Sequence, residues 1–456
     1  MSSTQLSKGL RAALCACALA LALPLAGPAA AQKPFLDVGK QPPITVLVAS
    51  TPWYPAFEKV VATYEQQTGN RIKLDTTPFG GVLEKARNAV RSGQSPYDLM
   101  TLDTQWTIEF YEGGFLAPLS EIDTAFRLPK EVLSFGDSGY WNAQKRWRTA
   151  DGGKLMAYTV LGNVQLLYYR ADLLKQAGLA PPKTWNDVLA VCAKLGDPPK
   201  MYGFVARGEK GNGIRYDWQS VMLAEGASVV KDPAAGDYTV TINSAQARKA
   251  LDLYIDLLKR CGPANYGSLG QGDVIQLLAT GKAVQGDVVT AAFASFEDPN
   301  KSAVVGKLET VPLPSAPGGG SGAVIGNWNA VIPKNLSGAQ KKAALAFSRW
   351  FLTYDAQRVF AEAGGIPNRS DVFTSDLAKE PRLRWMPAYL ATQKFAKQEL
   401  GYAEGAQVEQ ILGLRLNQAL IGEMSSGKAL NTAAKEIEEL FRKNGRRTGA
   451  LPPLPE

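Results

Sequence analysis

The clearest pattern of hydrophobic and polar positions lies between Ile44 and Trp106. A continuous apolar run, Ile44–Ala49, is followed by apolar residues with the i, i+3, i+4, i+7 spacing of one buried helix face, namely Phe57, Val60, Val61 and Tyr64. The helix is expected to end at Thr68–Asn70, and Arg71–Asp75 then alternates as a strand does. Strands that alternate with helices predict βαβ units and a mainly parallel sheet, hence an α/β fold class.

Aromatic and neutral polar residues follow the predicted strands of this stretch. In a parallel sheet, ligands lie beyond the carboxyl ends of the strands. Those ends carry Trp53 and Tyr54, then a bend at Phe79, Gly80 and Gly81, then Asp103, Thr104, Gln105 and Trp106. This composition favours a neutral polyhydroxy ligand over a phosphate or a metal ion.

The rest of the chain continues the alternation and then becomes helical. Lys154–Tyr169 predicts one or two buried strands, Thr184–Asp187 has the T-x-x-D form of a capping box, and a helix is expected from Ser244 to Cys261. From Ser337 onward the pattern is almost wholly helical. Gly318–Gly322 resembles a phosphate-binding loop, but it lacks the following Lys-Ser/Thr and the G-x-G-x-x-G spacing, so a flexible loop is the better interpretation.

The first residues predict export. Lys8 and Arg11 precede an apolar segment, residues 12–25, that is too short to span a membrane. Ala29–Ala31 provides a small-residue cleavage site, so we expect a Sec-type signal peptide over residues 1–31 and a periplasmic mature chain. A lipoprotein acylated at Cys15 or Cys17 is the alternative, but both cysteines precede most of the apolar segment. No later stretch predicts a membrane span.

Charge and composition exclude several functions. Without Lys8 and Arg11 the chain has 48 basic and 42 acidic residues, a net charge of about +6. The cations at 442–443 and 446–447 favour a solvated helix end over a nucleic-acid surface. Histidine is absent, which excludes His-based triads, HExxH zinc sites and imidazole bases but leaves carboxylate-only chemistry open. Neither a metal site nor a cofactor is predicted.

Two cysteines, Cys192 and Cys261, remain after removal of the signal peptide. An exported compartment permits disulfides, and an even count fits one bridge, which would tie two predicted helices at their C-terminal ends. Two buried free thiols are the alternative.

Several segments together resemble the extracellular solute-binding proteins of carbohydrate ABC importers, the maltose-binding-protein-like family. The resembling segments are Phe57–Gly69, Ser92–Leu99 with Tyr97 inserted before the Asp, Gly113–Leu119, Leu167–Leu174 with Arg170 in place of the usual Asn, Gly178–Trp185, Gly281–Val284 and Val311–Pro314. Each motif alone is weak. Their number, order and spacing extend over almost the whole mature chain.

The resemblance implies a two-lobed periplasmic-binding-protein fold of type II, with a mainly parallel sheet in each lobe. It places residues 42–156 and 285–335 in an N-terminal lobe, and residues 157–284 and 336–456 in a C-terminal lobe. It also implies an ABC permease of the inner membrane as partner, and we expect a monomer. The positions of Cys192 and Cys261 resemble those of a bridge in a glucose-binding branch of the family.

The predicted function is therefore binding of a sugar, either a mono- or oligosaccharide or a polyol, between the lobes, without catalysis. The predicted ligand-binding residues are Trp53, Tyr54, Phe79, Gly80, Asp103, Gln105, Trp106, Asn163, Trp218, Asp287, Asn327, Trp328 and Arg369. Helix capping or turn chemistry is the alternative for Asp103 and Asp287, and a salt bridge for Arg369. The rival function is a secreted glycosidase or lyase that uses two carboxylates, for which Asp103 and Asp287 are the candidates.

Overall fold

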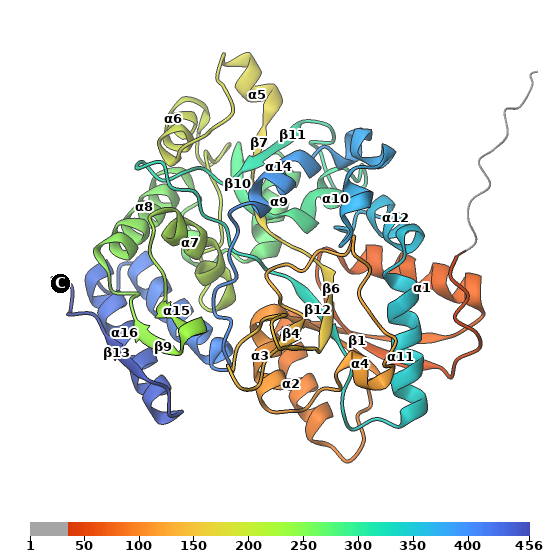
Figure 1. Ribbon diagram of the computed structural model, residues 1–456. Coiled ribbons are helices and arrows are strands. Elements are labelled where there is room, and N and C mark those ends of the chain that lie inside the picture. Colours follow the sequence, from red (N-terminus) through yellow and green to blue (C-terminus); the bar gives the residue numbers. More distant parts are fainter. Residues whose placement is uncertain (1–34) are drawn as a thin grey trace, which may run out of the picture. The chain divides into compact units, whose positions relative to one another are not determined.

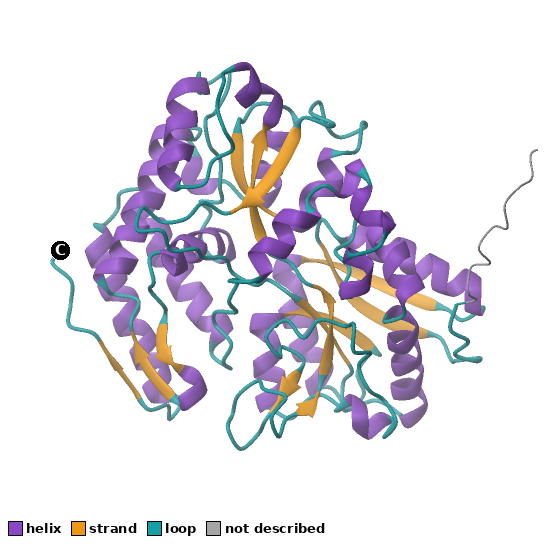
Figure 2. Ribbon diagram, turned by 45° about the horizontal axis from the view of Figure 1, so that its top comes forward, coloured by secondary structure: helices purple, strands orange, loops and turns teal. Residues whose placement is uncertain are grey.

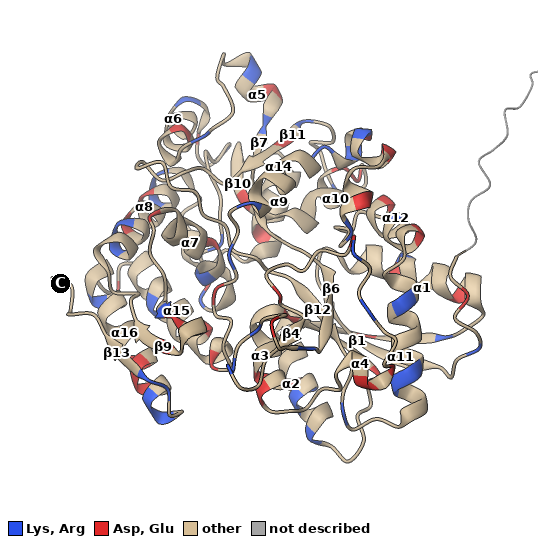
Figure 3. Cartoon of the chain, in the orientation of Figure 1, with Lys and Arg blue, Asp and Glu red and all other residues tan. Residues whose placement is uncertain are grey.

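The computed structural model describes residues 35–456. The predicted signal peptide, its cleavage site after Ala31, and Cys15 and Cys17 lie outside the described residues. Within them, the chain builds two α/β lobes, each around its own sheet (Figure 1). Basic and acidic residues are interspersed along the elements of both lobes (Figure 3).

The first lobe is built on a five-stranded sheet with the order β2-β1-β3-β12-β6. Its strands are β1 (Ile44–Ser50), β2 (Ile72–Pro78), β3 (Leu99–Asp103), β6 (Ala157–Leu161) and β12 (Trp328–Val331). β1 pairs in parallel with β2 and β3, whereas β12 is antiparallel to both β3 and β6. The mainly parallel sheet predicted from the sequence is therefore present only in the β2-β1-β3 half.

Helices on both faces of this sheet complete the first lobe (Figure 2). They are α1 (Tyr54–Thr68), α2 (Phe79–Arg91), α3 (Thr104–Glu112), α4 (Leu119–Ile122), α11 (Gly338–Phe351), α12 (Tyr354–Glu362), α13 (Ser370–Phe373) and the short η4 (Asp376–Lys379). β4 (Tyr140–Trp141) and β5 (Lys154–Leu155) form a short antiparallel hairpin in the segment between α4 and β6.

The second lobe is built on a sheet of order β10-β7-β11, formed by β7 (Gln165–Arg170), β10 (Gln285–Val289) and β11 (Leu308–Pro312). Both pairings are antiparallel. Isolated parallel bridges from Tyr202 to Ala283 and from Val205 to Gly286 extend the sheet beyond β10. The prediction of a mainly parallel sheet is wrong for this lobe.

The remaining elements surround this second sheet. They are α5 (Ala171–Gln176), α6 (Trp185–Leu195), α7 (Asn212–Ala224), α8 (Ala245–Cys261), α9 (Gln271–Ala279), α10 (Phe293–Phe296), α14 (Met386–Gln393), α15 (Gly405–Leu420) and α16 (Ser426–Lys443), with η1 (Pro233–Ala235), η2 (Tyr266–Ser268), η3 (Thr290–Ala292) and η5 (Pro381–Leu383). A small sheet of order β13-β9-β8 joins β8 (Val230–Asp232), β9 (Asp237–Val240) and β13 (Thr448–Ala450).

Strand pairing corrects the predicted division into lobes. β6, at 157–161, belongs to the first sheet, whereas β10 and β11, within the predicted segment 285–335, belong to the second. Helices α11 and α12, within the predicted segment 336–456, pack against α1 of the first lobe. Within residues 35–456 the chain therefore passes between the lobes three times: between β6 and β7, between β11 and β12, and between η4 and α14. The sequence did not indicate these places because each depends on pairing between distant segments.

Local signals fixed several helix ends as predicted. The Thr184 hydroxyl accepts a hydrogen bond from the Asp187 backbone, and the Asp187 carboxylate accepts from the Thr184 backbone, which forms the predicted capping box of α6. Ser244 caps α8 by accepting from the Ala247 backbone. α1 ends at Gly69, whose φ of 68° is in the left-handed region that favours glycine.

Two predicted loops are helix starts. Phe79 and Gly80, predicted as a bend, are the first residues of α2. Asp103 ends β3 and caps α3, so Thr104, Gln105 and Trp106 form the first turn of that helix. A strand followed at once by a helix leaves no room for a separate loop, and the side chains of the first turn are directed by helical geometry.

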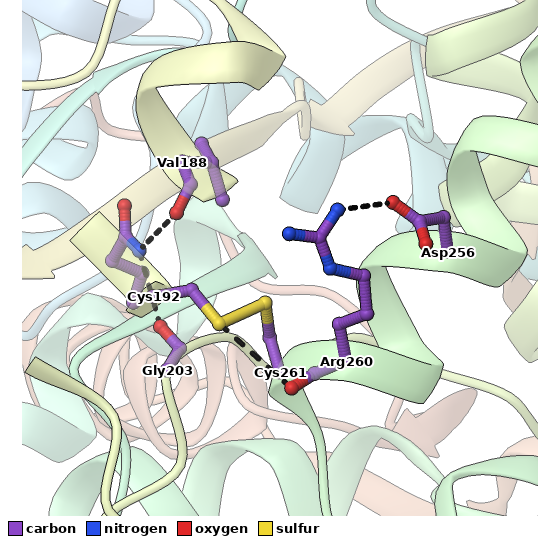
Figure 4. The surroundings of a disulfide bond; sticks show 7 residues. Val188, Cys192, Gly203, Asp256, Arg260 and Cys261 are labelled. Atoms are coloured by element: carbon purple, nitrogen blue, oxygen red, sulfur yellow. Dashed lines mark hydrogen bonds and ion pairs between the residues drawn. A yellow bond between two sulfur atoms is a disulfide. The ribbon is translucent and has the colours of Figure 1, made fainter. Parts of the chain in front are cut away.

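A disulfide joins Cys192 in α6 to Cys261 at the end of α8, which selects the bridge over two free thiols. Figure 4 shows the two cysteines between these helices, with the Arg260 side chain turned toward Asp256. Arg260 donates to the Asp256 carboxylate at 2.9 Å. The bridge links residues 69 positions apart and so holds two outer helices of the second lobe together.

We expect the double substitution of Cys192 and Cys261 by serine to lower the free energy of unfolding by up to about 4 kcal/mol, because the bridge restricts the unfolded chain. Urea-induced unfolding followed by circular dichroism measures this change. Wild-type protein in reductant is the matched control and should lose a similar amount. An unchanged unfolding midpoint in both samples would contradict the prediction.

Candidate ligand-binding cavity

A cavity of about 460 Å³ lies between the two lobes. The first lobe contributes Ser50, Thr51, Pro52, Trp53, Phe79, Asp103 and Trp328. The second lobe contributes Arg207, Glu209, Asn212, Tyr216, Gln271, Gly272, Ile275, Val289 and Ala291, and the connecting segments add Asn163 and Gly326. Because both lobes supply its walls, the cavity depends on how closely they approach each other.

Aromatic side chains form the wall on the first lobe. Trp53 precedes α1, Phe79 begins α2 and Trp328 begins β12, so three separate elements deliver them to one edge of the sheet. The ring centroids of Trp53 and Trp328 are 5.6 Å apart, and those of Phe79 and Trp328 are 6.0 Å apart. Trp106 lies behind this wall, 4.9 Å from Phe79 and 6.0 Å from Trp328 between ring centroids. The wall is thus a packed and rigid apolar surface.

A buried arginine lies opposite. Arg207 donates from Nε to Oδ1 of Asp217 at 2.8 Å, and its backbone N–H donates to Oδ2 at 2.8 Å. Its guanidinium lies 5.0 Å from the ring centroid of Tyr216, a cation–π geometry. The carboxylate of Asp217 and the ring of Tyr216 therefore hold Arg207 in one orientation at the cavity.

Tyr216 is itself fixed by a close backbone approach. Its hydroxyl donates to the carbonyl of Val324 at 3.2 Å. A Cβ at Gly326 would lie 2.0 Å from the same hydroxyl, so only glycine fits there. The segment that returns to the first lobe thus passes directly over the phenol ring.

Asp287 belongs to a buried network behind the cavity. Gln165 donates from Nε2 to Oδ2 of Asp287 at 3.3 Å and also to Asp217. Burial, with Asp217 nearby, raises the pKa of Asp287 well above its ordinary value. Asp287 does not line the cavity.

Asp103 is a cavity carboxyl whose protonation changes near neutral pH. It accepts from the Gln105 backbone at 3.2 Å as the cap of α3. Burial, and then the charge of Glu409, raise its pKa from 3.8 to about 7, against the opposing effect of Arg215. The pKa of Glu209 is also raised, mainly by burial, while Arg207 opposes the rise.

Asn163 lines the cavity where the chain first passes between the lobes. Its side-chain oxygen accepts from the Ala291 backbone at 3.3 Å, and its carbonyl accepts from Gly326 at 2.9 Å. One residue thereby joins two of the connecting segments.

Five of the predicted ligand-binding residues line the cavity: Trp53, Phe79, Asp103, Asn163 and Trp328. The other eight do not: Tyr54, Gly80, Gln105, Trp106, Trp218, Asp287, Asn327 and Arg369. The Tyr54 hydroxyl donates to Glu58 at 2.9 Å, and Gly80 is exposed within α2. Gln105, Trp106 and Asn327 are buried behind the cavity wall or beside it.

Trp218 and Arg369 lie away from the cavity, and each has other contacts that account for its position. Trp218 is fully buried in α7. Arg369 donates from Nε to Asp371 at 2.9 Å and from Nη1 to the carbonyl of Leu352 at 2.9 Å, which satisfies the salt-bridge alternative.

Sequence reasoning did not select Arg207, Glu209, Asn212, Tyr216 or Gln271. One signal was available in the segment Tyr216–Trp218. Residues two positions apart in an α-helix are about 200° apart around the helix axis. Only one of the rings of Tyr216 and Trp218 could therefore face the cavity. The choice depended on which face of α7 packs inward, and the sequence alone does not show it.

Among residues 35–456, no group of three or more Cys, Asp or Glu side chains is arranged to hold a metal ion. No described helix is long and apolar enough to cross a membrane.

Comparison with known proteins gives a consistent result. A family of bacterial extracellular solute-binding proteins matches residues 49–358. A probable ABC transporter-binding protein of Deinococcus radiodurans is 27% identical over 348 residues, which cover 71% of this chain and 79% of the relative. A mannitol-binding protein of Pseudomonas aeruginosa is 25% identical over 385 residues, covering 78% and 83%.

A solved structure has the same fold. The ABC transporter solute-binding protein of Agrobacterium radiobacter K84, in complex with ribitol, superposes with a TM-score of 0.77. It is 23% identical, and the match covers 89% of this chain and all of that one. The predicted two-lobed fold class is confirmed.

We expect the stability of Asp103→Asn, relative to wild type, to increase as the pH rises from about 4 to about 7. In this range the folded wild type keeps a proton on Asp103 that the unfolded chain has lost, so wild-type stability falls with rising pH. An asparagine removes this titration and still caps α3. Between pH 4 and pH 8 this titration should change the difference in unfolding free energy by at most about 4 kcal/mol.

Thermal unfolding of both proteins at pH 5, 6, 7 and 8 measures this difference without ligand. Asp237→Asn is the matched control, because the pKa of Asp237 is lowered to about 2 and its partly buried side chain is ionised throughout this range. A difference between Asp103→Asn and wild type that stays constant with pH would contradict the prediction.

Proposed function

Because the chain belongs to the bacterial extracellular solute-binding protein family, we propose that it binds a sugar or polyol between its lobes and delivers it to an ABC permease. The observation that carries this proposal is the cavity itself. It has an aromatic wall on one lobe and hydrogen-bonding side chains on the other.

The chemistry of the walls fits a neutral polyhydroxy molecule. The C–H face of a sugar packs against aromatic rings, which Trp53, Phe79 and Trp328 provide. Hydroxyl groups need fixed hydrogen-bonding partners, and Arg207 and Asn212 provide such groups on the opposite side of the cavity. Because Asp217 already neutralises Arg207, a charged ligand is not needed to balance the cation.

The size of the cavity indicates a small ligand. Small-molecule sites span roughly 300–1,000 Å³, and the volume of about 460 Å³ lies in the lower part of that range. A monosaccharide, a disaccharide or a linear polyol suits this space better than a long oligosaccharide. The relative from P. aeruginosa is a mannitol-binding protein, and the similar A. radiobacter structure contains ribitol. Both support the sugar and polyol class.

Capture proceeds by closure of the lobes. The ligand first binds to one lobe, and rotation about the three connecting segments then brings the other lobe over it. Asn163 and Gly326 lie in two of these segments and also line the cavity. The closed form would dock on the permease.

The compartment and assembly follow from the same proposal. The protein would be exported by a signal peptide cleaved after Ala31, act in the periplasm as a monomer, and contact neither nucleic acid nor, by itself, a membrane. Its family consists of extracellular solute-binding proteins.

Binding without catalysis is favoured over glycoside cleavage. A carboxylate-dependent glycosidase needs two carboxyl groups on opposite sides of one bond. Of the two candidates, Asp103 lines the cavity, whereas Asp287 is buried behind it with Gln165 and Asp217. Incubation with maltose and cellobiose should leave both sugars intact, and protein-dependent cleavage would overturn the proposal.

A thermal-shift screen of hexoses, disaccharides and linear polyols, including D-mannitol and ribitol, tests the ligand class. A ligand that binds only the folded protein raises its melting temperature. Isothermal titration calorimetry of each hit should give micromolar affinity, roughly −8 kcal/mol. If no sugar or polyol shifts the melting temperature, the proposed ligand class is wrong.

Phe79→Ala should weaken binding of such a hit roughly tenfold, or about 1.4 kcal/mol, because it removes apolar surface that the ligand would bury. Phe79 is only partly buried, so the fold should tolerate the change. Phe115→Ala is the matched control, since Phe115 is also partly buried in the first lobe but lies outside the cavity. Equal affinity of the two variants would contradict a role for Phe79 in binding.

A further inference from the structure

Gln105 joins the two lobes through both ends of its side-chain amide. It lies in the first turn of α3, is only 6% exposed and does not line the cavity. Its Nε2 donates to Oε2 of Glu409 at 2.7 Å, and its Oε1 accepts from Nη2 of Arg215 at 2.7 Å. Both partners belong to the second lobe.

The two partners form an ion pair that is complete without Gln105. Arg215 in α7 and Glu409 in α15 are 1% and 3% exposed and contact each other directly. Asn212 donates to Oε2 of Glu409 at 2.8 Å, and Nη1 of Arg215 donates to Gln219 at 3.0 Å. The second lobe therefore presents a preformed acceptor and a preformed donor to α3.

Only an amide suits this position among neutral side chains of its length. Its N–H₂ group matches the carboxylate of Glu409, and its carbonyl matches the guanidinium of Arg215. Hydrogen bonds to charged groups are stronger than those between neutral groups. They are shielded from water here, because all three side chains are buried.

The backbone confirms a close approach at the same place. α3 packs against α15, and a Cβ at Gly405, the first residue of α15, would lie 3.0 Å from the carbonyl oxygen of Gln105. At the other end of α3, Glu112 accepts from Arg446 of the second lobe at 2.9 Å. Helix α3 is thus the surface of the first lobe that meets the second lobe beside the cavity.

We propose that Gln105 is a closure latch, a positioning residue that holds the lobes together and so sets ligand affinity without touching the ligand. The part that concerns affinity rests on the proposed function. Separation of the lobes would return the amide of Gln105 to water and leave the ion pair of Arg215 and Glu409 intact within the second lobe. The latch therefore favours the closed arrangement without weakening either lobe.

Gln105→Ala tests the latch in the ligand-free protein by small-angle X-ray scattering. The radius of gyration should increase relative to wild type, because a larger fraction of molecules is open. Gln219→Ala is the matched control, since it removes a hydrogen bond to the same arginine but within one lobe. Its radius of gyration should equal that of wild type.

A charge exchange distinguishes the hydrogen bonds from packing. Gln105→Glu places a second carboxylate beside Glu409, and Glu409→Gln leaves Arg215 without its carboxylate, so each single variant should open. The double variant restores one carboxylate, one amide and one guanidinium, and it should recover the wild-type radius of gyration. Asp103 is near this cluster and titrates near neutral pH, so all variants are compared at one pH.

Affinity supplies the second readout. For a sugar or polyol identified by the thermal-shift screen, Gln105→Ala should raise the dissociation constant roughly tenfold, because apparent affinity falls with the fraction of closed-competent molecules. The double variant should restore affinity. If no such ligand is found, the proposed function fails while the scattering result still decides the latch.

Two results would overturn the latch. One is a radius of gyration for Gln105→Ala equal to that of wild type. The other is a double variant no more compact than the single ones, which would assign the effect to packing alone. Far-ultraviolet circular dichroism of every variant identifies any that fails to fold. If a charge-exchange variant does not fold, the radius of gyration of Gln105→Ala relative to wild type decides the question.

Discussion

The cavity depends on the insertion of β12 between β3 and β6. Its pairing aligns Trp328 with Asp103 on one side and with Leu161 on the other. A single register thus brings an aromatic ring and a carboxyl group, more than 200 residues apart in the chain, to the same edge of the sheet. It also draws Gly326 against Asn163, two residues where the chain passes between the lobes.

Helix α7 connects the cavity with the contact between the lobes. Arg207 is held by Asp217 of this helix, and Tyr216 beside it faces the cavity. Arg215, on the same helix, points to Glu409 and Gln105. Buried charges on both faces are costly unless each is paired, and here each has a partner. The pairing fixes the rotation of α7 about its axis, and with it which side chains reach the ligand.

The sequence was sufficient for features set by local rules. The helix face of Phe57–Tyr64, the capping box at Thr184 and the family resemblance were all confirmed. Trp53 and Asp103, at or just beyond a strand end, line the cavity. Their neighbours Tyr54 and Gln105 do not, because helical geometry turns those side chains elsewhere. Trp218, Arg369 and the lobe membership of β10 were not placed well, because each depends on which distant segment packs against it. Gln105 was predicted as a binding residue, and the structure shows its amide bonded to the second lobe instead.

The cluster of Trp53, Trp106 and Trp328 has a practical consequence. Indole emission responds to the polarity and water exposure of its surroundings. Two of these three rings line the cavity, and the third packs directly against that wall. Ligand entry would change the surroundings of the two rings that line the cavity, so their emission would report occupancy without an attached dye.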